Sequence, residues 1–295
     1  MKKEYPESIQ EFSGKFKEEQ DCYDYLMVIK FPEGFKCSVC KNDRYWKYKN
    51  PSIIRCTSCK VSYRVTAGTS FDNRHLPLRT WLYALWFMVS QKSGISALGL
   101  GREIGIERQK TTWKLLALIR KSMTQVGKDK LAGTVEIDEV FVGGVHKGKT
   151  GRGALGKELV LVAVEDKGKK GYGRIRMQII QDATSATLLE AIQTMVEVGS
   201  SIRTDEFRSY DMLTKHNYKH IKVPKNSAIG EDPTPLVHRI ASLLKRWLLG
   251  THQGGIHLEN LQSYLDEYVF RFNRRTSHSR GKLFYRLVQA MLGVK

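Results

Sequence analysis

The sequence predicts a mixed α/β protein built from several parts, and three observations support this class. Between residues 133 and 223, short strand-like runs alternate with one helical pattern. A compact cysteine-bearing module occupies residues 35–66, and apolar residues at helical spacing dominate the remaining segments. We therefore divide the chain into five parts. These are a lead-in over 1–34, a cysteine module over 35–66, a helical segment over 67–130, an α/β domain over 131–275 and a basic C-terminal helix or tail over 276–295.

Length and composition fit a globular protein with a basic surface. The chain has 295 residues, of which 41% are apolar and 27% are charged. Lys and Arg number 49 against 30 Asp and Glu, so the net charge is 49 − 30 = +19. Three segments carry the excess: residues 102–130 (+5), 145–176 (+6) and 271–295 (+7). A charge spread in this way favours a long contact surface for a polyanion.

Membrane and secreted proteins are the classes that the sequence disfavours. The longest apolar run, Trp81–Val89, has nine residues, whereas a spanning helix needs about twenty. The first twelve residues hold no apolar stretch, so we expect no secretory signal. We therefore expect a reducing, cytoplasmic location, where cysteines serve as thiolates or metal ligands rather than disulfides.

Four of the five cysteines form two closely spaced pairs. Cys37 and Cys40 flank two residues, Cys56 and Cys59 flank two more, and fifteen residues separate the pairs. Each pair can lie on a tight turn, and four thiolates complete a closed tetrahedral zinc site, which is structural. The fifth, Cys22, receives no role.

Basic and aromatic residues lie between the two pairs. They are Arg44, Trp46, Lys47, Tyr48, Lys49 and Arg55. This mixture suits a nucleic-acid contact. Packing of the aromatic rings inside so small a module is an equal alternative, and both remain open.

The segment after the cysteine module predicts a helix over 78–91 and then shorter helices over 93–121. Residues 93–98 are typical of a capped helix start, and residues 102–106 of a first helix and turn of a helix-turn-helix. Glu107–Lys121 is then the recognition helix, with Arg108, Lys110 and Lys114 pointing outward to DNA. The alternative is a helical packing unit with a solvated charged face.

Acidic residues interrupt the first of the predicted strands. We expect strands over 134–142, 159–165, 174–180, 201–204 and 220–223, and a helix over 185–198. The first strand holds Glu136, Asp138 and Glu139, of which Glu136 and Asp138 share one face. Carboxylates in an apolar strand repel one another and resist burial unless a cation lies among them.

A further carboxylate, Asp205, directly follows the fourth predicted strand. The end of a strand is a common position for a metal ligand, and capping of the next helix is an equal alternative.

The predicted helix over 236–249 carries two polar residues on one line. At 100° per residue, its apolar stripe comprises Ile240, Leu243, Leu244 and Trp247. His238 and Lys245 lie opposite that stripe, about 10 Å apart along the axis. His238 can therefore meet a metal while Lys245 reaches a neighbouring phosphate. Taken alone, the pair is more typical of a solvated polar face.

These residues together suit metal-assisted phosphodiester chemistry. Two divalent cations held by carboxylates can stabilise both the attacking and the leaving oxygen of an in-line displacement. Mg²⁺ prefers oxygen ligands, whereas an imidazole ligand is better suited to Mn²⁺.

The chain resembles the zinc-ribbon transposases of bacterial insertion sequences, which are related to the Merlin-type transposons. The resemblance runs from about Phe35 to Arg275 and rests on several motifs. They are the four-cysteine ribbon, residues 135–139 with Gly143-Gly144, Thr204-Asp205-Glu206, His238 with the segment Lys245–His252, and Tyr264–Arg275.

This resemblance implies a ribonuclease-H-like catalytic domain with an acidic triad. Asp138 is then on the first strand, Asp205 at the end of the fourth, and the third ligand on the helix after the fifth. His238 occupies that third position, where the family often carries Glu, and Lys245 matches the family's trailing lysine. A histidine in place of a carboxylate removes one charged ligand, which weakens a cation site without abolishing it.

We therefore expect a DNA transposase of a bacterial insertion sequence, associated with the nucleoid. The ribbon and the helical segment recognise the terminal inverted repeats, and Asp138, Asp205 and His238 hold Mg²⁺ or Mn²⁺ for strand cleavage and strand transfer. Gly143-Gly144, the basic loop His146–Lys157 and Arg271–Arg275 are candidate DNA contacts, although Arg271–Arg275 can also fold back on the helices. A homo-oligomer on DNA is expected. The alternatives are a DNA-binding protein with an inert ribonuclease-H-like domain and a nuclease that does not transpose.

Overall fold

The computed structural model describes residues 4–72, 75–124, 129–143, 157–224, 232–253 and 257–294. It divides into two compact units, which we describe separately. The first unit comprises residues 1–126 and 277–295, and the second comprises residues 127–276. The C-terminal segment 276–295, which the sequence-based division sets apart, therefore belongs almost entirely to the first unit.

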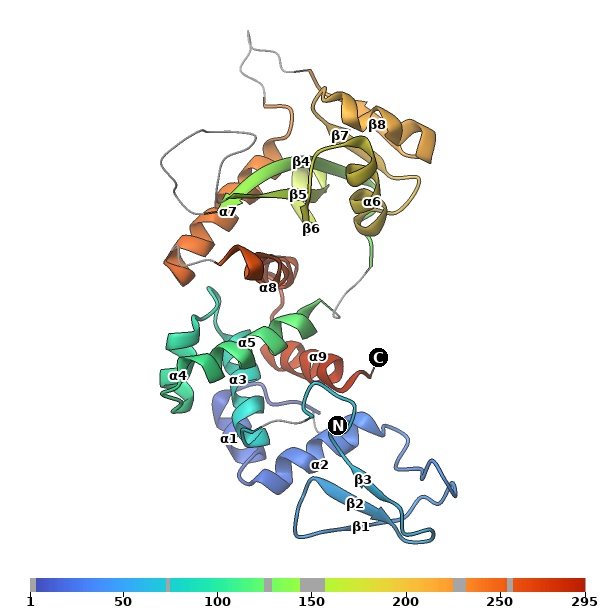
Figure 1. The fold of residues 1–295 in the computed structure, drawn as a ribbon, viewed down its shortest axis with the longest axis vertical. Helices are drawn as coiled ribbons and strands as arrows, with labels where there is room; N and C mark the ends of the chain where they lie inside the picture. The colour runs from blue at the N-terminus through green and yellow to red at the C-terminus, as the bar shows by residue number, and fades with distance from the viewer. Residues whose placement is uncertain are drawn as a thin grey trace. The chain divides into compact units, whose positions relative to one another are not determined.

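The first unit combines helices with a small three-stranded sheet (Figure 1). Its helices are α1 (Ile9–Lys15), α2 (Glu19–Lys30), α3 (Leu78–Ser90), α4 (Ala97–Ile104), α5 (Gln109–Met123) and α9 (Arg280–Leu292). Its strands are β1 (Tyr45–Lys47), β2 (Ile53–Cys56) and β3 (Ser62–Arg64), which pair in that order and antiparallel. The lead-in over residues 1–34 contains α1 and α2.

An aromatic core explains why the C-terminal helix returns to the first unit. Phe284 of α9 is fully buried, and its ring lies 5.8 Å from Trp86 of α3, 5.9 Å from Phe12 of α1 and 6.1 Å from Tyr25 of α2. One side chain thus joins the two ends of the chain. Gly281 allows this approach, because a Cβ atom there would collide with the backbone carbonyl of Pro6.

Helices α4 and α5 form the predicted helix-turn-helix pair. The Ser96 hydroxyl caps α4 by accepting the Gly99 N–H at 3.1 Å. Gly105 ends the helix with a φ of 68°, which an L side chain rarely adopts. The turn then packs directly on Gly101, where a Cβ atom would lie 2.8 Å from the Ile106 carbonyl oxygen.

The second unit contains a five-stranded mixed sheet (Figure 1). Its elements are β4 (Thr134–Gly143), β5 (Lys157–Asp166), η1 (Gly168–Lys170), β6 (Tyr172–Ile180), α6 (Ser185–Met195), β7 (Ser201–Thr204), η2 (Arg208–His216), β8 (Lys219–Lys222), α7 (Pro235–His252), η3 (Leu258–Asn260) and α8 (Leu261–Asn273). The strand order is β6-β5-β4-β7-β8. Strand β5 is antiparallel to both neighbours, whereas β7 and β8 run parallel to β4. This topology confirms the expected ribonuclease-H-like fold.

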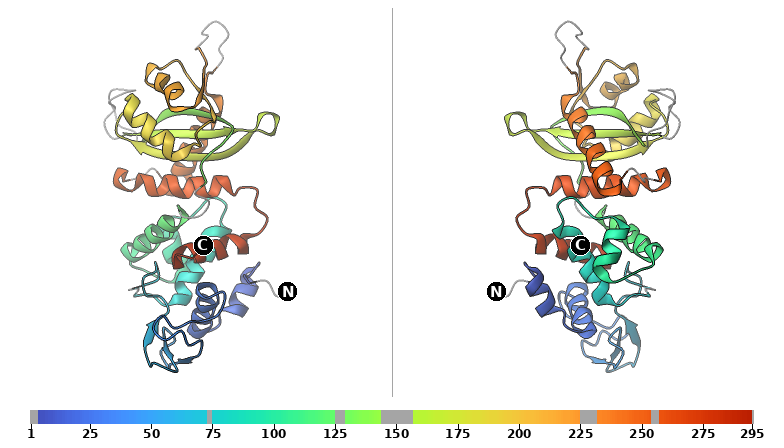
Figure 2. Two further views of the ribbon diagram at one scale, coloured as in Figure 1. Left: turned by 90° about the vertical axis from the view of Figure 1, so that its right-hand side faces the viewer. Right: turned by 90° about the vertical axis from the view of Figure 1, so that its left-hand side faces the viewer.

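Helices cover both faces of this sheet. Odd-numbered residues of β4, such as Val135 and Ile137, pack with Leu188 and Ile192 of α6 in one buried cluster. Helix α7 lies against β4 and β5 on the other face (Figure 2). The side chains of β4 therefore alternate between the α6 face and the α7 face.

Helix α8 protects the free edge of β6. Asn273 accepts the Ile175 N–H at 2.7 Å, and Gln262 accepts the Ile179 N–H at 2.9 Å. Arg271 pairs with the buried Glu267 at 2.8 Å, and Arg275 donates to the Gly173 carbonyl at 3.3 Å. Arg275, one of the candidate DNA contacts of the sequence, therefore joins the end of α8 to the sheet edge, whereas the Arg271 pair lies within α8.

Two further predictions concern the basic loop and the absence of membrane-spanning segments. Gly144 and residues 146–156 of the predicted basic loop lie outside the described residues. Among the residues that are described, no helix is long and apolar enough to cross a membrane.

Candidate functional site

The four paired cysteines converge in the first unit. The Sγ atoms of Cys37, Cys40, Cys56 and Cys59 all lie within 4.8 Å of one another. The closest pairs, Cys37 with Cys59 and Cys40 with Cys56, are 3.5 Å apart. Four sulfurs about 2.3 Å from one tetrahedral ion lie about 3.8 Å from each other, so the set fits zinc.

The two cysteine pairs adopt the same turn. The residue after each pair, Lys41 or Lys60, has a positive φ of 61° or 65°. Its N–H donates back to the carbonyl of the first cysteine, at 3.0 Å for Cys37 and 3.2 Å for Cys56. Each turn therefore presents two sulfurs to one point, as the sequence spacing predicts.

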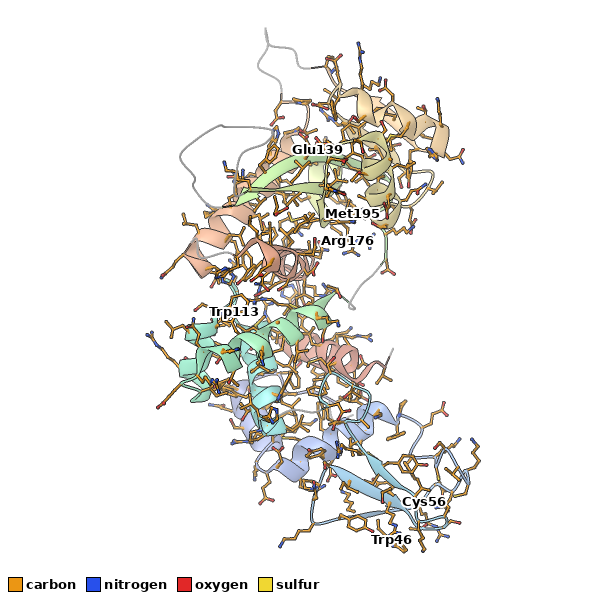
Figure 3. The ribbon with its side chains drawn as sticks, viewed as in Figure 1. Trp46, Cys56, Trp113, Glu139, Arg176 and Met195 are labelled. Atoms are coloured by element: carbon orange, nitrogen blue, oxygen red, sulfur yellow. The ribbon has the colours of Figure 1, made fainter. Side chains whose placement is uncertain are left out.

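The ribbon separates its aromatic residues into two groups. Tyr45 and Tyr63 pack edge-on against buried Phe35, with ring centroids 5.2 and 5.4 Å away. Trp46 instead faces solvent and is 48% exposed, and Tyr48 is 41% exposed (Figure 3). Trp46 and Tyr48, the aromatic residues for which packing was an alternative, thus lie on the surface, and other rings fill the inside of the ribbon.

In the second unit, Asp138 lies on the α7 face of β4. Its side chain is 14% exposed. One carboxylate oxygen accepts the Thr234 hydroxyl at 2.6 Å, and the other accepts the Glu139 N–H at 2.8 Å. Burial raises the pKa of this carboxyl, and the nearby charge of Asp205 raises it further, against the lowering effect of these hydrogen bonds.

His238 of α7 faces this carboxylate. Its Nε2 atom lies 3.3 Å from Asp138 Oδ2, and its Nδ1 atom lies 2.6 Å from Asp232 Oδ2. The contact with Asp232 orients the imidazole ring so that Nε2 faces the Asp138 carboxylate.

The sequence analysis placed His238 opposite the buried stripe of its helix, and this was wrong. The buried residues of α7 are Val237, Ile240, Ala241, Leu244 and Leu248. At 100° per residue, this stripe is rotated by about 60° from the predicted one. His238 therefore borders the packed face, which is how a half-exposed side chain reaches the sheet.

Asp205 directly follows β7, which pairs parallel with β4 through Arg203 and Glu136. The side chain is partly buried, and one carboxylate oxygen accepts the Phe207 N–H at 3.0 Å. It thus caps the following turn, as the alternative interpretation expected. Because Arg203 pairs with Glu136, Asp205 and Asp138 each lie two residues further along neighbouring parallel strands, and the charge of Asp205 helps to raise the pKa of Asp138.

The donor set fits a hard divalent cation. Two carboxylates that repel each other, together with an imidazole whose Nε2 faces one of them, are suitable ligands for Mg²⁺ or Mn²⁺. The ligand atoms of this set lie further apart than the cysteine sulfurs. Among the described residues, the cysteines alone bring three or more possible ligand atoms all within 4.8 Å.

Family comparisons match the two regions just described. Residues 17–62 match the transposase zinc-ribbon domain family, and residues 130–273 match the ISXO2-like transposase domain family. The chain belongs to the zinc-ribbon DDE transposases of insertion sequences. An uncharacterized transposase-like protein of Haemophilus influenzae is 29% identical over 116 residues, which are 39% of this chain and 93% of that protein.

Solved structures that match part of this chain include an integrase and a transposase. The catalytic core domain of BIV integrase is 16% identical over 52% of this chain and 94% of its own, with a TM-score of 0.34. The Mos1 transposase in its paired-end complex is 13% identical over 72% of this chain and 75% of its own, with a TM-score of 0.34.

Glu136 was placed on the face of Asp138 from the sequence but received no role, and the structure gives it one. Its side chain is 1% exposed, and it accepts the Val237 N–H in the first turn of α7 at 2.8 Å. Burial raises its pKa to about 7 against the effect of hydrogen bonds from Val237 and Leu236. The carboxylate therefore ties the start of α7, and with it His238, to β4. The signal in the sequence was its period-two spacing from Asp138.

The remaining predicted residues of the transposase lie on the surface. Lys245 is exposed on α7, two turns after His238. Arg108, Lys110 and Lys114 are exposed on and before the first turns of α5. Glu139 lies on the other face of β4 from Asp138 and accepts the Tyr210 hydroxyl at 2.8 Å (Figure 3).

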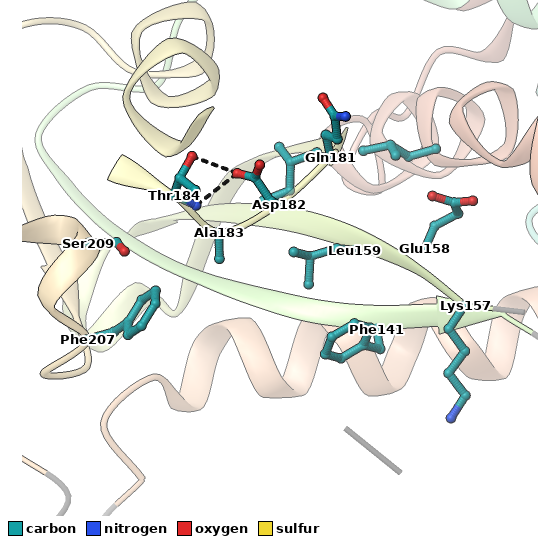
Figure 4. Close-up of a pocket in the computed structure, with 12 residues that line it drawn as sticks. Phe141, Lys157, Glu158, Leu159, Gln181, Asp182, Ala183, Thr184, Phe207 and Ser209 are labelled. Atoms are coloured by element: carbon teal, nitrogen blue, oxygen red, sulfur yellow. Dashed lines mark hydrogen bonds between the residues drawn. The ribbon is translucent and has the colours of Figure 1, made fainter. Parts of the chain in front are cut away.

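A cavity of about 860 Å³ in the second unit lies on the α6 face of the sheet. Phe141, Leu159, Ala183 and Phe207 form its apolar walls (Figure 4). Asp182 at its rim accepts both the N–H and the hydroxyl of Thr184, the cap of α6. Since Asp138 and His238 lie on the α7 face, this cavity holds none of the predicted catalytic side chains among its described walls.

Proposed function

We propose that this transposase binds the ends of its element and carries out metal-dependent DNA strand cleavage and strand transfer. The observation that carries the proposal is the meeting of Asp138 on β4 with His238 on α7, beside the charge of Asp205. The bound cations supply charge stabilisation for the attacking and leaving oxygens of a phosphodiester. The ribbon cysteines hold a structural zinc ion.

Each side chain has a distinct task in this proposal. Asp138 and Asp205 would hold the cations through carboxylate oxygens, and His238 would add a nitrogen ligand through Nε2. The Asp232 contact fixes the ring orientation that this task requires. Lys245 orients a phosphate beside the site, and a homo-oligomer holds two DNA ends together.

Cleavage of a duplex from one border of the gene tests the proposal. With Mn²⁺ or Mg²⁺, the protein should nick this DNA at the border and join its 3′ end to a target plasmid. Asp138→Asn should lower both reactions by at least about 100-fold, because losing a ligand costs more than losing an outer partner of a ligand. His238→Ala should lower the Mn²⁺ reaction more than the Mg²⁺ reaction. Asp211→Asn, at an exposed carboxylate paired with Lys222, is the matched control.

The outcomes separate the proposal from its alternatives. Binding without cleavage at any metal concentration is the result of an inert ribonuclease-H-like domain. Cleavage without joining, and without preference for the border, is the result of a plain nuclease. Full activity of Asp138→Asn would exclude the proposed mechanism.

A further inference from the structure

The first unit contains a cavity of about 560 Å³ at the start of α5. Trp81, Leu115 and Leu118 contribute apolar surface to it. Arg108, Lys110 and Lys114, the three cations predicted to contact DNA, also line it. An apolar wall with a cationic rim suits an anion that carries an apolar group.

Trp81, one of the side chains that line this cavity, carries a buried donor. Its side chain is 4% exposed, and its indole N–H has no hydrogen-bond partner among the described residues. Its ring packs on Phe71, with centroids 5.8 Å apart. Buried N–H groups are nearly always paired, so an unpaired one in a lining residue sets this cavity apart.

The first turn of α5 contributes further positive charge to this cavity. Arg108 occupies the N-cap position, makes no capping hydrogen bond with its side chain, and no acidic residue follows in the first turn. The first N–H groups of a helix lack partners within the helix and carry partial positive charge. The one carboxylate of the described lining, Asp72, accepts the Gly68 N–H at 3.2 Å and lies 3.8 Å from Arg64.

We infer that this cavity binds a phosphate of the DNA backbone, with the adjoining deoxyribose against Trp81 and Leu118. The inference rests on the proposed function, because it takes DNA as the ligand. It changes the role predicted for Arg108, Lys110 and Lys114. They clamp a phosphate and set the position of the duplex, and they do not read base edges.

Indole NMR of the full chain labelled with ¹⁵N-tryptophan tests the inference. Five indole signals are expected, and Trp81→Phe, which keeps the ring and removes the N–H, identifies one of them. A 14-base-pair duplex of arbitrary sequence should shift the Trp81 signal. Lys110→Ala with Lys114→Ala should remove the shift, weaken binding of every duplex about tenfold, and lower the salt dependence by about 1 to 2, since each phosphate contributes about 0.9.

Lys121→Ala is the matched control, because Lys121 is exposed at the other end of α5. It should leave the Trp81 shift intact. Inorganic phosphate, added alone, distinguishes a free phosphate from a backbone phosphate: a shift only with DNA shows that the sugar is required, and a shift with both shows that phosphate suffices. A Trp81 signal that stays still with duplex, together with wild-type binding by the double variant, would overturn the inference. Asp138→Asn should keep the shift while losing cleavage, so failure of the catalytic proposal is seen separately.

Discussion

The two candidate metal sites of this chain are built in opposite ways. The cysteine site takes its ligands from two short turns between residues 37 and 59, and those turns share one backbone conformation. The carboxylate site takes Asp138 from β4, Asp205 from the end of β7 and His238 from α7, across 100 residues of chain.

The two sites also differ in the pKa values of their ligand groups. In the ribbon, hydrogen bonds from the Cys40 N–H and the Tyr63 hydroxyl help to lower the pKa of Cys37 to about 6, whereas burial and the other three thiols raise the pKa of Cys59. In the second unit, burial and the charge of Asp205 raise the pKa of Asp138. The ligand positions of the closed cysteine site are therefore determined by nearby turns of the chain. Those of the open carboxylate site depend on tertiary packing that holds groups of like charge together.

Removing one ribbon ligand should have the largest effect. Cys56→Ser should abolish zinc binding and unfold residues 35–66, because structural zinc supplies roughly 10–16 kcal/mol in small zinc domains. Zinc per chain by mass spectrometry and hydrogen exchange over the ribbon measure this. Cys22→Ser, at a buried cysteine outside the cluster, should retain one zinc ion. One zinc ion in Cys56→Ser would contradict the four-cysteine site.

Removing the Glu136 carboxylate, which accepts the Val237 N–H, tests how much this hydrogen bond stabilises the contact between α7 and β4. Glu136→Ala leaves the buried Val237 N–H without its acceptor and should destabilise the second unit by about 1–3 kcal/mol. Glu136→Gln keeps an acceptor oxygen and should cost less than about 1 kcal/mol. Urea unfolding measures both. Equal stability of the Ala variant and the wild type would show that the cap does not hold α7.

Elements with strong local signals could be predicted from the sequence. The strands predicted over 134–142 and 201–204 correspond to β4 and β7. The helix predicted over 185–198 corresponds to α6, which ends three residues earlier, at Met195. Alternating side chains correctly placed Glu136 and Asp138 on one face, because strand periodicity is a property of the backbone.

Tertiary packing decided what the sequence could not show. The buried stripe of α7 is rotated because Val237 and Ala241, rather than Trp247, pack inward. Asp232 precedes the helix, so helical spacing gives no sign of its contact with His238. Arg275 looked free for DNA because its acceptors, the carbonyls of β6, lie about 100 residues earlier.

Glu165 is a buried carboxylate that, unlike Asp138, is paired with an arginine, Arg174. Burial alone would raise the pKa of Glu165, but hydrogen bonds from Arg174 and the Ala132 N–H lower it to about 2. A folded pKa below the ordinary 4.5 stabilises the second unit above pH 4.5, and this stability is lost as pH falls toward 2. Glu165→Gln should therefore cost on the order of 2 kcal/mol at pH 7 and flatten the acid limb of stability against pH.

Glu158→Gln, at a partly exposed carboxylate on the same strand, is the control for this measurement. It should leave the acid limb unchanged. An unaltered acid limb in Glu165→Gln would show that the Arg174 pair does not carry the pH dependence.

The smallest expected effect concerns the solvent face of the ribbon. Trp46 lies opposite Arg55 in the strand register, and the Lys60 ammonium lies 4.1 Å from the centroid of its ring. An exposed ring with a lysine ammonium beside it is suited to stack on a base or sugar of DNA, worth about 1–3 kcal/mol. Trp46→Ala should therefore weaken DNA binding about tenfold while one zinc ion remains bound. Val39→Ala, at an exposed residue of the first cysteine turn, should bind as the wild type does. Equal affinity of the two variants would limit the ribbon to a structural role, with its DNA contacts left to other parts of the chain.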